Sequence, residues 1–286
     1  MLCARLGVLD QLTEKHFETK FLSHAAAILE KDFPQALTEL DEALSGLTIP
    51  ITEIVAVGGG ETKGTQRMRR ALSNLGWKKF EFVIRKIING VERESTSHEI
   101  DHVKEFDGNA LALEIEWNNK DPFFDRDLEN FKRLHAEGAI SAGIIVTRGT
   151  SLHDNVRDFV YRFAKENNVN SFLDLDRLNI ELTKRKKTAI HLRTTRKKNP
   201  IEFARAWTEN FVSDKYGEAT THWRKLMDRV DRGVGNPCPL LLIGLPDSIV
   251  TFEQPATTEQ VAPAIEKASA ENSLDVPERE ISNPPR

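Results

Sequence analysis

The sequence predicts an α/β fold in which a mixed β-sheet lies between helices. The first observation is the order of the periodic segments, which runs helix, three strands, helix, strand, helix, strand. The second is the composition, because 286 residues that are 39% hydrophobic and 29% charged suffice for one main domain with a sizeable core. We expect a helical amino-terminal layer over residues 1–50, the main domain over 51–249 and a disordered acidic tail over 250–286.

The amino-terminal segments have the spacing of helices. Apolar residues recur at helical intervals over residues 10–46. Three glycines at 58–60 then precede a predicted helix that ends near Leu75, before Gly76. The order Gly-Lys-Ser/Thr of a phosphate-binding loop is missing there, so we interpret the glycines as a flexible turn before a capped helix and expect no nucleotide cofactor.

The predicted strands follow the glycine turn. Residues 79–88 alternate between two faces, and the turn at 107–109 joins residues 99–101 to the alternating run 110–117 as a β-hairpin. The remaining predicted elements are a helix over 123–136, a buried strand over 140–147, a helix over about 154–166 and a short strand over 171–173. This order gives the mixed sheet.

The net charge of −4 is unevenly distributed. Residues 177–232 contain fifteen lysines and arginines against seven acidic residues, whereas residues 251–286 contain three against seven. The latter stretch is rich in Pro, Ala, Thr, Ser and Glu, a composition typical of disorder.

Cysteines and hydropathy bear on the compartment. Cys3 and Cys238 are far apart in the sequence and form no disulfide framework, so we expect two small buried residues in a reducing cytoplasm. No run approaches the ~20 apolar residues of a membrane span, and acids occur too early for a secretory signal. We therefore expect a cytoplasmic protein with no membrane partner.

The predicted hairpin is lined with acids. Glu114 and Glu116 alternate with apolar residues and therefore point to one side of their strand. If Asp101 on the neighbouring strand faces the same side, three carboxylates converge, which is costly unless a proton or a cation offsets the repulsion. A hard divalent cation, above all Mg²⁺, suits such oxygen ligands. The alternative is a solvated strand face.

A second motif overlaps the hairpin. His98 and His102, with Glu99 between them, match the H-E-x-x-H pattern of zinc peptidases. That chemistry requires a helix, where the two histidines lie one turn apart. We predict a strand here, on which His102 faces away from Asp101, and keep the zinc metallopeptidase as an alternative function.

The runs that flank the acids carry a resemblance to a known family. Asp101 followed by Glu114 and Glu116 fits the PD-(D/E)xK nuclease pattern. The run EIEWNNKDPFFDRDL at 114–128, GIIVTR at 143–148 and NPCPLLLIGLP at 236–246 more closely resemble BglII/BstYI-type type II restriction endonucleases. The resemblance covers roughly residues 50–246.

The resemblance implies a restriction-endonuclease-like α/β fold, a homodimer around double-stranded DNA, and Mg²⁺-dependent hydrolysis at a short palindrome, which has a GATC core in known relatives. By matching positions, Asp101 and Glu114 become metal ligands, with the backbone carbonyl of Ile115 a third. Glu116 stands where most of the superfamily has lysine, and we expect it to orient the attacking water or accept its proton. Glu61 is a candidate for an additional acid.

We expect DNA contacts on the loops beside the acids, because arginine pairs with guanine and asparagine with adenine. The candidates for contacts near the bases are Asn118, Asn119, Lys120, Arg148, Thr150, Ser151 and Asn155. Lys186 and Lys187 belong to a basic segment that we assign to phosphates. Turn residues and solvated surface cations are the alternative interpretation. A nonspecific or repair nuclease of the same superfamily and a catalytically silent DNA-binding protein remain alternative functions.

Overall fold

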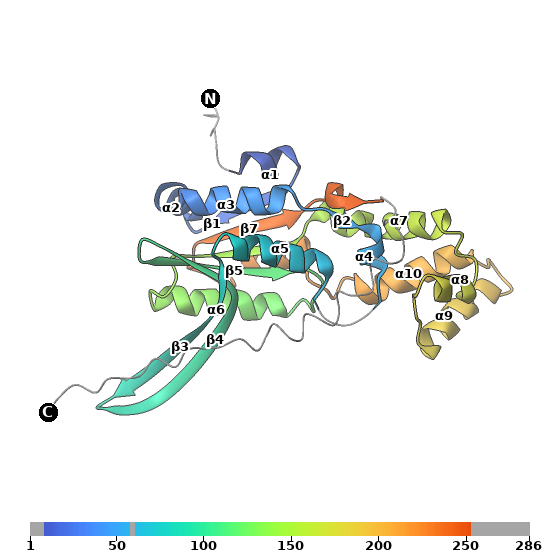
Figure 1. The fold of residues 1–286 in the computed structure, drawn as a ribbon. Helices are drawn as coiled ribbons and strands as arrows, with labels where there is room; N and C mark the ends of the chain where they lie inside the picture. Colours follow the sequence, from blue (N-terminus) through green and yellow to red (C-terminus); the bar gives the residue numbers. More distant parts are fainter. Residues whose placement is uncertain (1–8, 58–60, 253–286) are drawn as a thin grey trace. The chain divides into compact units, whose positions relative to one another are not determined.

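A six-stranded mixed sheet forms the centre of the fold (Figure 1). The structure is a computed structural model, and it describes residues 9–57 and 61–252. The strand order is β1-β7-β6-β5-β4-β3, with β5, β6 and β7 parallel and the other neighbours antiparallel. The strands are β1 (Glu18–Leu22), β3 (Lys78–Ile88), β4 (Val91–Phe106), β5 (Asn109–Glu116), β6 (Ala142–Arg148) and β7 (Leu240–Leu245). The predicted fold class is confirmed.

Helices cover both faces of this sheet. In Figure 1, α3 lies above the strands, α5 is drawn across them and α6 lies below them. The helices are α1 (Asp10–Glu14), α2 (Ala25–Asp32), α3 (Pro34–Ser45), α4 (Ile51–Val55), α5 (Lys63–Asn74), α6 (Phe123–Ala136), α7 (Thr150–Glu166), α8 (Phe172–Arg177), α9 (Lys184–Thr195), α10 (Phe203–Lys215) and α11 (Trp223–Asp231). A small second sheet pairs β2 (Ile49–Pro50) with β8 (Val250–Thr251).

The core on the α6 side fixes this helix against the sheet. Phe124, Leu128 and Phe131 lie at helical spacing on one side of α6 and are fully buried against strand residues such as Ile145. Gly143 in β6 permits the close approach, because a Cβ atom there would lie 2.3 Å from a ring carbon of Phe131. This close packing fixes the position of α6 relative to the acidic strand β5.

The hairpin and the helix before it form as predicted. Asp107 and Gly108 have φ angles of 48° and 80°, the left-handed pair of a tight hairpin turn. The hydroxyl of Thr62 accepts a hydrogen bond from the Thr65 backbone N–H and caps α5, and Gly76, with φ 94°, follows its end. The expectation that Cys238 is buried is also confirmed.

Two elements differ from the prediction. Residues 10–46 are helical except for β1, which forms an edge strand on β7 and is too short to show its own periodicity. The predicted strand at 171–173 is not formed, because α8 begins at Phe172, directly after Ser171. The hydroxyl of Ser171 donates to Asp174 Oδ2 at 2.8 Å, a side-chain bond that favours the start of a helix.

Two boundaries also differ. α7 begins at Thr150, four residues before the predicted start. Val250 and Thr251 form β8, so these two residues do not belong to a disordered tail. The rest of the predicted tail, the glycines at 58–60 and Cys3 lie outside the described residues.

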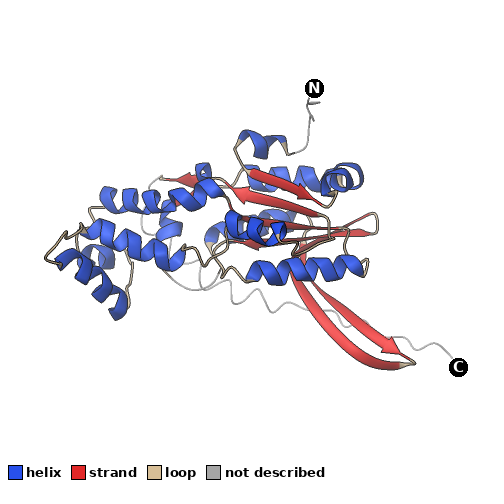
Figure 2. Cartoon of the chain, turned by 180° about the vertical axis from the view of Figure 1, so that it is seen from behind, coloured by secondary structure: helices blue, strands red, loops and turns tan. Residues whose placement is uncertain are grey.

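Strands β3 and β4 continue past the body of the sheet as a two-stranded ribbon, visible in Figures 1 and 2. The β4–β5 ladder ends at the pair His102–Leu113, whereas β3 and β4 stay paired out to Ile88–Val91. We call residues 83–97 of this ribbon the arm. The separation of β4 from β5 opens the sheet beside the acidic end of β5.

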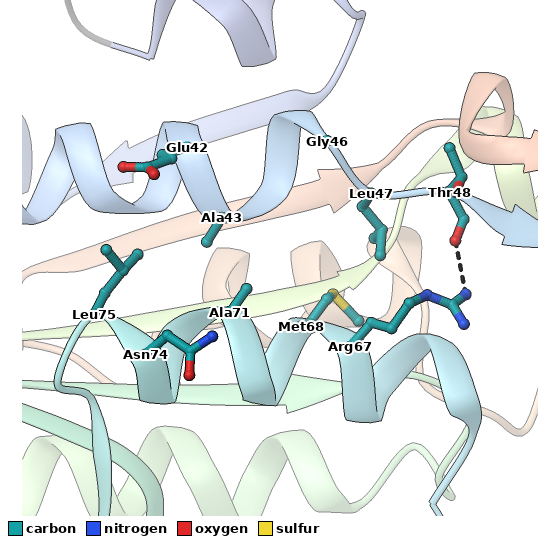
Figure 3. Close-up of a pocket in the computed structure, with 10 residues that line it drawn as sticks. All are labelled: Glu42, Ala43, Gly46, Leu47, Thr48, Arg67, Met68, Ala71, Asn74 and Leu75. Atoms are coloured by element: carbon teal, nitrogen blue, oxygen red, sulfur yellow. Dashed lines mark hydrogen bonds between the residues drawn. The ribbon is translucent and has the colours of Figure 1, made fainter. Parts of the chain in front are cut away.

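On the opposite face, α3 and α5 enclose a cavity of about 370 Å³ (Figure 3). Arg67 of α5 lies at its rim, where it donates to the Thr48 carbonyl at 2.7 Å and to both carboxylate oxygens of Glu53, at 2.7 and 2.8 Å. These bonds tie the first turns of α5 to the preceding segment. They fix the entry to α5, where Glu61 lies.

Candidate active site

The acids of the predicted hairpin meet where β4 leaves β5. Glu114 and Glu116 are 4% and 3% exposed and point toward α6, on one face of β5 as predicted. Asp101 is exposed on β4, one residue before the last ladder pair, His102–Leu113. After the larger effects of burial and of Asp127, the charge of Asp101 raises the pKa of Glu114, so Asp101 lies on the Glu114 side of β4.

Burial and mutual repulsion disfavour the ionised forms of these acids. The pKa of Glu114 lies well above its ordinary value, first because the side chain is buried and then because Asp127, Asp101 and Glu116 surround it. Burial, with Asp127 next in importance, raises the pKa of Glu116 to about 8. A nearby cation would relieve this repulsion and restore the ionised forms.

Asp127 on α6 is the member of the group that sequence reasoning missed. It is fully buried, and its Oδ1 atom accepts bonds from Arg126 Nε at 2.8 Å and Nη2 at 2.7 Å. Its Oδ2 atom has no N–H or hydroxyl donor among the described residues, and the Asp127 carboxylate also contacts the Glu116 carboxyl. The available signal was its place in the apolar stripe of α6, between Phe124 and Phe131, where an acid is out of pattern.

Glu116 is held by neighbours on two sides. Asn119 donates to its Oε2 atom at 2.8 Å, and Arg126 lies 3.6 Å from its Oε1 atom. Glu61, the additional acid suggested by the sequence, lies near Asp101, whose charge contributes to the raised pKa of Glu61 after the larger effect of burial. Glu61 is also paired with Arg69 at 3.1 Å. Its role as an additional acid of the site remains a prediction.

The donor set fits a hard divalent cation. The carboxylates of Glu114, Glu116 and Asp127 are buried and lie near enough to raise one another's pKa, with Asp101 acting on Glu114, and no N–H or hydroxyl donor reaches Asp127 Oδ2 among the described residues. The carbonyl of Ile115 belongs to the stretch of β5 that has no ladder partner on the β4 side. Its role as a ligand remains a prediction.

The H-E-x-x-H alternative is contradicted by the fold. His98 and His102 lie on strand β4, where four residues span about 13 Å, too far for both rings to bind one ion. Both side chains are buried, whereas Asp101 between them is exposed. The two histidines meet different helices, since His98 contacts Asn130 of α6 and His102 lies near Arg69 of α5.

The predicted DNA contacts divide into two groups. Asn119 and Lys120 are exposed and Asn118 is half-buried, on the loop that leaves β5 at the acids. Arg148 is 1% exposed and donates to the carbonyls of Trp117 at 2.7 Å and Thr221 at 2.8 Å. It also donates to the Thr220 hydroxyl, so the buried guanidinium connects the loop after β5 to the loop before α11 and does not reach solvent.

The other predicted contacts make internal bonds. The Thr150 hydroxyl donates to Glu18, the Ser151 hydroxyl accepts from the Asp247 backbone, and Asn155 donates to the Asp247 carboxylate. These three residues belong to the first turns of α7, not to a free loop, and their side chains stabilise that end of the helix. Lys186 pairs with Asp214 at 2.6 Å and Lys187 with Asp176 at 3.7 Å, both near the surface.

A second cluster, His153, Glu218 and His222, has the residue types of a metal site. The two imidazole rings are stacked 3.8 Å apart at an angle of 11°. Because the nitrogen lone pairs lie in nearly parallel planes, they do not converge on one ion. Arg148 lies 3.4 Å from His153 Nδ1 and adds a repulsive charge. The cluster links α7 to the loop before α11, which carries the Arg148 partners.

A mixed sheet with carboxylates beside the Asn-Asn-Lys loop has the residue types expected of a nuclease that uses a divalent metal. The family model described as restriction endonuclease BglII/BglIII matches residues 17–245, and the chain belongs to this family. These are type II site-specific deoxyribonucleases, which act on DNA and use a divalent metal. A comparison with curated proteins gave no match. Among the described residues, no helix is long and apolar enough to cross a membrane.

Proposed function

We propose that the protein is a Mg²⁺-dependent restriction endonuclease that cuts double-stranded DNA at a short palindrome, with a GATC core as the first sequence to test. The observation that carries this proposal is the convergence of Asp101, Glu114 and Glu116 where β4 leaves β5. Membership of a type II restriction family supports sequence-specific cutting over nonspecific cutting.

Asp101 and Glu114 would hold the cation, with the Ile115 carbonyl as a third ligand. A bound Mg²⁺ supplies a Lewis acid for the phosphate oxygen and lowers the pKa of water. Glu116 would orient the attacking water or accept its proton, because its carboxylate lies on the same strand face as Glu114. Asn119, at 2.8 Å, fixes the orientation of Glu116 for that task.

DNA recognition is assigned to the loop after β5. Asn118 and Lys120 leave the acidic strand directly, so a base edge near the scissile phosphate lies within their range. Asn119 lies on the same loop but already donates to Glu116, so it contacts DNA only with a group that this bond leaves free. Arg148 is removed from the proposed base contacts because it is buried. Thr150, Ser151 and Asn155 take second place because their polar groups are already bonded. Lys186 and Lys187 remain proposed phosphate contacts, for which each must leave an acidic partner.

A homodimer follows from the proposed palindrome, because two identical half-sites require two identical readers about a two-fold axis. Sedimentation of the protein on a duplex that carries the cleavage site should give two subunits per duplex. A single subunit that cuts only one strand would refute the dimer while leaving nuclease activity intact.

The decisive experiment is digestion of two plasmids that differ in their number of GATC sites, with and without millimolar Mg²⁺. Discrete fragments whose ends map to GATC support the full proposal. Discrete fragments with other ends support restriction but refute the GATC core. A smear indicates a nonspecific or repair nuclease, and DNA binding without cutting indicates a silent binding protein.

A further inference from the structure

Asp127 is buried more deeply than a salt bridge with Arg126 requires. It is fully buried in the apolar stripe of α6, although its Arg126 partner is 53% exposed and could meet a surface acid. Burying a carboxylate disfavours its charged form, and a pair with one exposed arginine compensates only part of this. The cost indicates a role for the carboxylate at the place where it is buried.

The unsatisfied oxygen of Asp127 identifies that place. Arg126 holds Oδ1 through a hydrogen bond from Nε at 2.8 Å and an ion pair from Nη2 at 2.7 Å. No N–H or hydroxyl donor of the described residues reaches the buried Oδ2 atom, and the other side chain bonded to Asp127 is the Glu116 carboxyl. The charge of Asp127 acts on both Glu114 and Glu116, so the carboxylate borders the acidic group from the α6 side. A buried oxygen that lacks a donor among several carboxylates has the surroundings of a cation ligand.

Two neighbours fix the carboxylate there. The fork of Arg126 holds Oδ1 with two nitrogens, which limits rotation of the carboxylate. The helix itself is fixed by Phe131 against Gly143, so Asp127 cannot withdraw from β5 without a change in core packing. The oxygen is therefore preorganised toward Glu114 and Glu116.

We propose that Asp127 is a fourth carboxylate of the metal centre, beside Asp101, Glu114 and Glu116, and that Arg126 is the positioning residue that aims its free oxygen. This inference rests on the proposed Mg²⁺ site and extends it to α6. It gives Arg126 and Asp127 a role in metal binding. The metal site would then be formed by residues of β4, β5 and α6.

The test is a titration of the DNA-free protein with Mn²⁺, followed by the electron paramagnetic resonance signal of the free ion. Asp127→Asn keeps the size and shape of the side chain and should weaken Mn²⁺ binding by about 10–100-fold. Asp125→Asn is the matched control, because it removes one negative charge from the same helix at a residue that is paired with Arg229 at 3.2 Å. It should change the affinity less than about twofold.

Arg126→Gln separates positioning from charge. Removal of a cation beside an acidic site should tighten Mn²⁺ binding if only electrostatics matter. If Arg126 aims the Asp127 oxygen, the same variant should instead bind Mn²⁺ more weakly than the wild type. Its side chain is 53% exposed, so the variant is expected to fold, and circular dichroism verifies this for all three variants.

The outcomes distinguish this inference from the proposed function. A wild type that binds no Mn²⁺ overturns the metal site as a whole. A wild type that binds Mn²⁺, with Asp127→Asn binding equally well, leaves the proposed function standing and overturns the role of Asp127. Tighter binding by Arg126→Gln, with weak binding by Asp127→Asn, retains the fourth carboxylate and refutes its positioning by Arg126.

Discussion

Arg148 at the end of β6 donates from its Nε atom to the carbonyl of Trp117 at 2.7 Å, and thereby connects the buried sheet to the residue that precedes the Asn-Asn-Lys loop. The same guanidinium binds the Thr221 carbonyl at 2.8 Å. Burial lowers the pKa of Arg148 to about 10, still far above neutral pH, so the group stays charged. One buried cation therefore supports the loop proposed to read DNA.

Arg148→Ala should destabilise the protein by about 3 kcal/mol, because it leaves buried carbonyls without donors and creates a cavity. Urea denaturation measures the loss. Arg224→Ala, which removes an exposed arginine paired with Asp154 at 2.5 Å, is the control and should cost less than about 1 kcal/mol. A stable Arg148→Ala variant with altered sequence preference would instead restore the base-reading role predicted from the sequence.

Asp101→Asn and Glu114→Gln should each reduce cleavage by more than about 100-fold, the upper end of the loss when groups that only support metal ligands are removed. DNA binding without Mg²⁺ should persist. Glu99→Gln is the matched control on β4, since Glu99 is exposed and pairs with Lys79 at 2.6 Å. The measurement is plasmid cleavage at millimolar Mg²⁺. Near wild-type cutting by Asp101→Asn or Glu114→Gln would show that the substituted residue is not part of the active site.

The acidic site should make stability depend on pH and Mg²⁺. The pKa of Glu116 is raised from 4.5 to about 8 in the fold, so the folded state binds more protons than the unfolded chain between these values. Stability without metal therefore falls as pH rises through this range, by up to about 1.4 kcal/mol per pH unit for one such group. Mg²⁺ stabilises the ionised acids and should raise the melting temperature more at pH 8 than at pH 6.

Glu114→Gln provides the comparison for this pH effect. It removes a second buried acid whose pKa is raised, first by burial and then by neighbouring carboxylates, and with it one proposed metal ligand. The difference in Mg²⁺ stabilisation between pH 6 and pH 8 should shrink in this variant. Equal Mg²⁺ stabilisation of the wild type at both pH values would contradict the expected coupling.

Gly143→Ala tests the packing that places α6 under the acids. The added Cβ would lie 2.3 Å from Phe131, so the ring or the helix must shift, at a cost of about 1–3 kcal/mol. Calorimetry measures the stability, and Mn²⁺ affinity reports the displacement of Asp127. Gly46→Ala, where a Cβ meets nothing within 4 Å, is the control. If Gly143→Ala is as stable as the wild type, the core around Phe131 accommodates the added methyl group without cost.

The sequence predicted the acidic hairpin because its signals are local. Alternation placed Glu114 and Glu116 on one face, and the turn at Asp107 and Gly108 determined the pairing of the two strands. The contribution of Asp127 could not be predicted in this way, since it depends on where a later helix packs. The burial of Arg148 likewise depends on a loop more than seventy residues further along the chain.

Within residues 9–57 and 61–252, neither edge of the arm pairs with another strand, since β4 has no partner on its inner side from Val91 to Asp101 and β3 is the last strand of the sheet. Exposed edges of this kind invite pairing between molecules. Ile87 and Val91 near the tip are 63% and 50% exposed, which strengthens the tendency, whereas Arg93 and its acidic neighbours oppose it. The arm is therefore the segment at which the protein is expected to aggregate first in concentrated solution.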